Sequence, residues 1–131
     1  MRQILGIMET EIKTIIELPE FDTGQYEGCE FHMLGGDASL LLRLAERPNF
    51  EFRFTRVRWH RYTQLHSCEA SWAREAYFRL IEVRPSELLD SFIKSDRSSQ
   101  KPYKELHHFR IFLDETGCHE LFAEAAASRE M

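Results

Sequence analysis

Residues 50–62 form one long run in which aromatic side chains and arginines alternate, FEFRFTRVRWHRY. Successive side chains of a β-strand point to opposite faces, so alternation with a period of two, rich in aromatic and β-branched residues, predicts a strand with one buried face. The phenylalanines would fill that face, and cations would line the other. We therefore expect residues 50–62 to be the central strand of a mainly β fold.

The alternation slips by one residue in the middle of this run. Without a slip, the phenylalanines would share a face with arginines, and burying unpaired guanidinium groups is prohibitive. A β-bulge at Thr55 and Arg56 restores the pattern, because it places Val57 and Trp59 with the phenylalanines. The open face then carries Arg53, Arg58, His60 and Tyr62.

Length and composition favour one domain with a single core. The chain has 131 residues, 43% of them hydrophobic and ten of them Phe, which suffices for a core without disulfides or metal. We expect one domain over residues 1–131, of mainly β (α+β) class. Its fold would be an antiparallel β-barrel or strongly curved sheet of six to seven strands. One short helix over residues 86–94, begun by Pro85 and by Ser86 as N-cap, would cover one side.

The other elements are read from local patterns. Strands are predicted over residues 29–34, 39–44 and 76–84, with a less regular stretch before the last of these. Residues 1–18 fit both a helical stripe and strand alternation, and the β-branched residues favour a strand near the end of this segment. Residues 95–104 are small, charged or prolyl, so we expect a mobile surface loop.

A hairpin is predicted near the end of the sequence. Gly117 suits the last place of a three-residue turn, where the backbone is left-handed. The register that follows pairs Leu113 with His119, and Ile111 with Leu121. One face is then almost wholly apolar, and the other carries His108, Arg110, Phe112, Glu120, Phe122 and Glu124.

Charge and cysteine content limit the function classes. The net charge is −5, yet residues 43–61 hold six arginines against two acids. Nucleic acid is a poor partner for a chain whose overall field opposes a polyanion. The three cysteines form no CxxC motif, and no signal peptide or membrane span is recognisable in the sequence. We therefore expect a cytoplasmic protein with reduced thiols and no membrane association.

The arginine-rich strand face is the candidate site. Forked guanidinium donors bind carboxylates and phosphates, although acids on neighbouring strands could pair with them instead. We expect a binding or interaction module that recognises an acidic protein partner or an anionic small ligand. The oligomeric state stays open, since an exposed edge strand could pair two copies. The candidate ligand-binding residues are Arg53, Arg56, Arg58, His60, Tyr62 and His66.

Catalysis and metal binding are the alternatives. A small enzyme would use a pocket in the barrel mouth lined by Arg58, His60 and His66 and act on an anionic substrate, but no nucleophile motif or phosphate-binding glycine loop supports it. We expect no metal and no cofactor. Among the Cys and His pairs that lie close in the sequence, only His66 and Cys68 have the spacing of two residues that places both side chains on one side of a strand. The other pairs considered are Cys29 with His32, His107 with His108, and Cys118 with His119.

Overall fold

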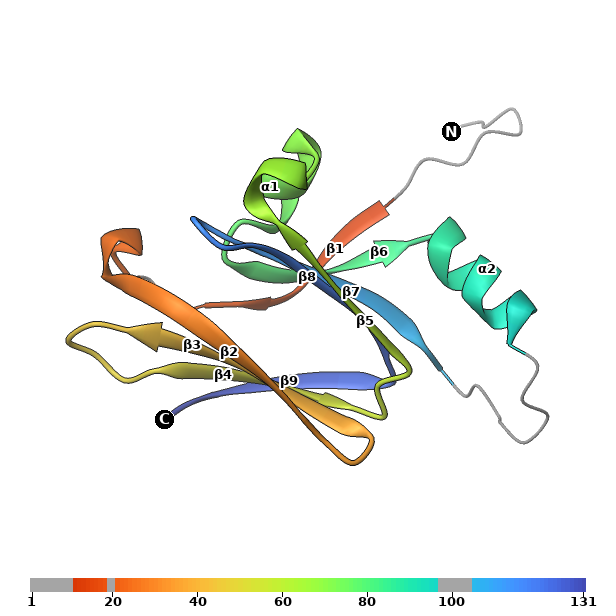
Figure 1. Ribbon diagram of the computed structural model, residues 1–131, viewed down its shortest axis with the longest axis horizontal. Coiled ribbons are helices and arrows are strands. Elements are labelled where there is room, and N and C mark those ends of the chain that lie inside the picture. The colour runs from red at the N-terminus through yellow and green to blue at the C-terminus, as the bar shows by residue number, and fades with distance from the viewer. Residues whose placement is uncertain (1–10, 19–20, 97–104) are drawn as a thin grey trace.

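The computed structural model describes residues 11–18, 21–96 and 105–131, and these form two antiparallel sheets with two α-helices (Figure 1). The mainly β, antiparallel class is therefore confirmed. The described residues contain nine strands, more than the six to seven expected, and they form two separate sheets in place of one closed barrel. Within the described residues, no helix has the length and apolar character needed to cross a membrane.

The larger sheet has five strands in the order β1-β6-β7-β8-β5. Their bounds are Glu11–Glu17, Arg79–Arg84, His107–Leu113, Gly117–Ala123 and Trp59–Gln64. The β1 strand confirms the strand favoured near the end of residues 1–18. The smaller sheet has the order β2-β3-β4-β9. Its strands are Tyr26–Leu34, Asp37–Leu44, Phe50–Thr55 and Ala125–Glu130.

The two sheets bury one apolar layer between them. Alternate residues of β3 and β4, including Leu40, Leu42 and Phe52, face Ile111 and Leu121 of the larger sheet. All five of these side chains have no exposed surface. Because strand side chains alternate, the same strands must present a second set of residues outward. In the larger sheet that outer face carries the polar groups described below.

The long run of residues 50–62 is two strands in two sheets. β4 belongs to the smaller sheet and β5 is an edge of the larger one, so the prediction of one bulged strand is wrong. The chain turns at Arg56, which has a left-handed backbone with φ of 54°. The Arg58 amide donates to the carbonyl of Phe122 at 2.8 Å, and the Glu124 amide donates to that of Thr55 at 2.9 Å. The ribbon of β4 and β9 therefore continues across this corner as the ribbon of β5 and β8.

This turn changes which residues of β5 face inward. Val57 packs on the core as expected. Trp59, predicted to lie with the phenylalanines, instead stacks on Phe122 on the outer face, with ring centroids 4.1 Å apart. His60 faces the space between the sheets and stacks on Phe31 of β2. From Trp59 onward, the predicted inward and outward sets are therefore reversed.

Two α-helices lie on the outer side of the larger sheet (Figure 1). The helix α1, Ala70–Ala76, covers a second apolar cluster that includes Ile81, Phe112 and Cys118. The sequence pattern does not predict this helix, and the strand predicted over residues 76–84 begins three residues too early. The helix α2, Glu87–Ser95, confirms the covering helix and its N-cap, since Ser86 Oγ accepts the Leu89 amide at 3.0 Å. Two short 3-10 helices, Thr23–Gln25 and Leu65–Ser67, complete the elements.

The predicted hairpin exists, with its faces correct and its register wrong. Leu113 pairs with Gly117, not His119, and Ile111 pairs with His119, not Leu121. Gly117 does have the expected positive φ, 134°, and Glu115 in the turn is also left-handed, with φ of 64°. Gly117 is the first residue of β8, and a Cβ there would lie 2.2 Å from the carbonyl oxygen of Thr63. The glycine therefore serves the close approach of β5, which the local sequence cannot reveal.

Candidate functional site

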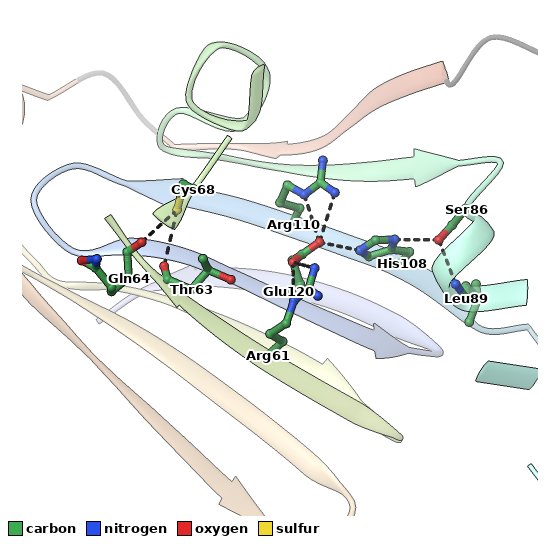
Figure 2. A network of polar contacts seen from close by, with 9 residues as sticks. All are labelled: Arg61, Thr63, Gln64, Cys68, Ser86, Leu89, His108, Arg110 and Glu120. Carbon is green, nitrogen blue, oxygen red and sulfur yellow. Dashed lines mark hydrogen bonds and ion pairs between the residues drawn. The ribbon is translucent and has the colours of Figure 1, made fainter. Parts of the chain in front are cut away.

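A buried ionic network lies on the outer face of the larger sheet, centred on Glu120 of β8 (Figure 2). Glu120 has no exposed surface. Its Oε1 accepts Arg61 Nη2 at 2.6 Å and Nε at 3.0 Å. Its Oε2 accepts Arg110 Nε at 3.1 Å and His108 Nε2 at 2.8 Å. β5, β7 and β8 are adjacent strands, so cross-strand pairing brings these side chains to one place.

The network keeps Glu120 ionised despite its burial. Burial alone would raise the pKa of Glu120, but hydrogen bonds from His108 and Arg61 and the charge of Arg110 outweigh it and lower the pKa to about 2. Trp72 of α1 lies over the Arg110 guanidinium, with 4.6 Å from Cζ to the ring centroid. Buried ion networks carry a desolvation cost that apolar packing avoids, so this network suggests a role other than stability.

The network extends from His108 to the start of α2. Ser86 Oγ lies 2.8 Å from His108 Nδ1, and the two residues are 7% and 2% exposed. Because the ionised Glu120 can only accept, His108 Nε2 must carry a hydrogen. When the imidazole is neutral, its Nδ1 is an acceptor, and the Ser86 hydroxyl can donate to it while accepting the Leu89 amide. Ser86, His108 and Glu120 thus form one directed chain of hydrogen bonds.

A pocket of about 520 Å³ opens above this chain, between α1 and the start of α2. Its apolar walls are Trp72, Val83, Pro85 and Leu88. Its polar lining includes Ser86, His108 and Arg110, with Glu69 and Glu87 also lining it. This volume falls within the range of small-molecule sites.

Arg110 has donor capacity left for a ligand. Its Nε and Nη2 both contact one oxygen of Glu120, and among the described residues no contact uses its Nη1. Arg110 is 8% exposed and lines the pocket. A guanidinium with free N–H groups at a desolvated pocket can form strong, charge-assisted hydrogen bonds to a carboxylate or phosphate.

A second polar cluster lies between the sheets, where β5 and β2 form neighbouring edges. His60 stacks on Phe31 at 3.8 Å between ring centroids, and His60 Nε2 is 3.0 Å from His119 Nδ1. Cys29 Sγ lies 3.7 Å from His119 Nε2. Burial lowers the pKa of both imidazoles, and the neighbouring His60 charge adds to the effect on His119, whose pKa falls to about 4.

The structure disperses the six residues of the predicted arginine site. Arg53 is exposed on β4 of the smaller sheet, and Arg56 and Arg58 lie at the corner. His60 faces inward, and the Tyr62 hydroxyl donates to the Thr116 carbonyl at 2.6 Å. His66 lies in the 3-10 helix after β5. Of the six, His60 and Tyr62 come together, around His119.

The residues of the pocket were not recognised as a site from the sequence. The hairpin pattern did place His108, Arg110 and Glu120 on one face, and the correct register would have set Arg110 directly opposite Glu120. The sequence predicts Ser86 as a helix cap only, and it does not predict α1, which carries Trp72. In the part of the chain that the structure describes, no three His, Cys, Asp or Glu side chains form a group that could hold a metal ion. The predicted mobile loop over residues 95–104 falls largely outside the described residues.

Comparisons of the chain with protein-family models, with curated proteins and with solved structures gave no match. The fold and the candidate site define a two-sheet antiparallel β protein with a pocket on the outer face of its larger sheet.

Proposed function

We propose that this protein is a binding module for a small organic ligand with an anionic group, and that the ligand occupies the pocket between α1 and α2. The observation that carries the proposal is that Arg110 lines this pocket and that, among the described residues, no contact uses its Nη1. The arginine row proposed from the sequence is replaced as the site, because its members lie on two different sheets.

The pocket lining favours a ligand with an apolar or aromatic body. Trp72, Val83 and Leu88 offer apolar surface, and Trp72 can stack with a planar ring. Arg110 is held in place by Glu120 and by Trp72, so little side-chain entropy is lost when it binds an anion. Glu69 and Glu87 also line the pocket, and they disfavour ligands with several negative charges. A monoanionic aromatic or branched carboxylate fits this combination best.

Tryptophan fluorescence provides the test. The chain has two tryptophans, Trp59 and Trp72, and Trp72 alone of the two lines the pocket. In a Trp59→Phe variant, titration with benzoate and phenylacetate should change Trp72 emission saturably, with the matched amides as neutral controls. An affinity near 1 mM, about 4 kcal/mol, is expected for such small probes.

Two conservative variants separate the pocket from the network. Arg110→Lys and Arg61→Lys each remove hydrogen bonds to Glu120, but Arg61 does not line the pocket. Loss of carboxylate binding in Arg110→Lys and its retention in Arg61→Lys would support the proposal. Equal binding of acids and amides, or equal losses in both variants, would overturn it.

A further inference from the structure

We propose that Ser86 is a nucleophile that attacks small carboxylic esters in this pocket, with His108 as its general base and Glu120 as the residue that positions His108. The inference rests on the proposed function for the location of the pocket and adds a reaction to it. Two contacts join the three side chains: Ser86 Oγ lies 2.8 Å from His108 Nδ1, and His108 Nε2 lies 2.8 Å from Glu120 Oε2. Nucleophile, base and orienting acid within hydrogen-bond reach are the signature of an activated serine.

The three groups come from separate parts of the chain. Ser86 precedes α2, His108 lies on β7 and Glu120 lies on β8. Their chain of hydrogen bonds is visible in Figure 2, and it ends at the pocket, which Ser86 and His108 both line. Helix capping alone explains the bond from the Leu89 amide to Ser86. Capping does not require the second contact of the serine hydroxyl, which is made to an imidazole that a buried carboxylate orients.

The start of α2 supplies donors for the negative oxygen of a tetrahedral intermediate. The first backbone N–H groups of a helix have no partner within the helix. Among the described residues, the amides of Glu87 and Leu88 have no acceptor, and both residues line the pocket beside Ser86. Backbone donors held in this way are the usual means of stabilising an oxyanion.

The reaction balances with water as the only other reactant. Ser86 Oγ bonds to the ester carbonyl carbon while its proton passes to His108 Nδ1, and the resulting oxyanion lies near the Glu87 and Leu88 amides. The bond to the alcohol oxygen then breaks, and that oxygen takes the proton from Nδ1. Water next attacks the acyl carbon and gives one proton to His108 Nδ1. The bond between that carbon and Ser86 Oγ then breaks, and Oγ takes the proton back from Nδ1. The serine is restored, and the products are an alcohol and a carboxylic acid of the class proposed for the pocket.

Labelling with a fluorophosphonate tests the nucleophile directly. The serine oxygen displaces fluoride and forms a stable phosphonate ester, so peptide mass spectrometry identifies the modified residue. The folded protein should be labelled at Ser86, and denaturation before labelling should abolish the reaction. Turnover of p-nitrophenyl acetate by the full chain, compared with buffer, measures the complete cycle.

Matched variants separate reactivity from helix capping. Ser86→Gly removes the hydroxyl at a position where glycine caps helices nearly as well as serine, and Ser95→Ala removes a serine at the other end of α2. Labelling and turnover should disappear in the first variant and persist in the second. His108→Gln should slow labelling about 100-fold or more, the usual contribution of a general base.

Two outcomes would overturn the inference. One is a folded protein, verified by circular dichroism, that is unlabelled at Ser86 and does not cleave the ester. The other is a Ser86→Gly variant that keeps full activity. Carboxylate binding measured by Trp72 fluorescence is independent of both, so an unreactive Ser86 can be told apart from a pocket that binds nothing.

Discussion

The imidazole rings of His60 and His119 share a hydrogen bond of 3.0 Å between the two sheets. One ring nitrogen must donate and the other accept, so two protonated rings would lose the bond and repel each other. The stacked Phe31 and the neighbouring Cys29 offer no charge to compensate. The pair therefore makes the contact between β5 and β2 sensitive to acid.

We predict that acid weakens this fold well before its carboxylates are protonated. Burial lowers the His119 pKa from 6.5 to about 4, so between these values the unfolded state binds more protons than the folded state. The stability that neutral His119 provides is full above pH 6.5 and falls as the pH is lowered towards 4. The loss should approach roughly 3 kcal/mol. Urea unfolding at pH 7.5, 5.5 and 4.5 measures it.

The matched variants for this prediction are His119→Gln and His32→Gln. The first should flatten the pH dependence, while the second removes an exposed histidine and should leave it unchanged. A wild-type stability that stays constant from pH 7.5 to 4.5 would contradict the prediction.

Glycine at position 117 should be nearly irreplaceable. A Cβ at Gly117 would lie 2.2 Å from the Thr63 carbonyl, and φ there is 134°. We expect Gly117→Ala to lower the free energy of unfolding by about 3 kcal/mol or more, because backbone must move. Gly36→Ala, with nothing within 4 Å, should change it by less than about 0.5 kcal/mol. Guanidinium denaturation of both variants measures these changes. Similar losses of unfolding free energy in the two variants would show that β5 and β8 do not approach this closely at Gly117.

Removing the charge of Glu120 should destabilise the protein strongly. Glu120→Gln leaves Arg61 and Arg110 partly buried without their carboxylate. Breaking a buried ion pair in this way costs roughly 3 kcal/mol or more. Glu30→Gln, which removes an exposed partner of Arg43, should leave the unfolding free energy nearly unchanged. The comparison uses urea unfolding at pH 7, and a small effect at Glu120 would mean that water reaches the network.

Charge reversal on the predicted arginine row should not affect ligand binding in the pocket. Arg53 lies exposed on β4, in the sheet that does not carry the pocket. Arg53→Glu should therefore bind the carboxylate probes like the wild type, whereas Arg110→Lys should not. Fluorescence titration of Trp72 measures both. A large loss of affinity for the carboxylate probes in Arg53→Glu would favour the arginine row proposed from the sequence as the binding site.

Local sequence patterns predicted where strands and helices lie better than they predicted which strands pair with one another. Alternation located β2, β3 and β4, and the capping serine located α2, because these signals lie within a few neighbouring residues. The corner at Arg56 depends on hydrogen bonds to Gly36, Phe122 and Asp37, which are distant in sequence. A slip in alternation at this point predicts a break, but it cannot say that the next strand joins another sheet.

The site was predictable only in fragments. One face of the hairpin correctly combined His108, Arg110 and Glu120, since side-chain parity survives a register error of two residues. Arg61 and Ser86 join them only through the pairing of β5 with β8 and the placement of α2. The spacing of Arg61 and Ser86 along the chain does not predict that they contact the hairpin residues.

The corner between the sheets also orders events during synthesis. β4 emerges from the ribosome early, but its second neighbour in the sheet is β9, which follows both helices and all of the larger sheet. Until β9 is made, one side of β4 exposes unpaired backbone donors and acceptors to other nascent chains. Completion of the smaller sheet is therefore a late step, and a ribosome stalled before residue 125 would hold a chain prone to aggregate.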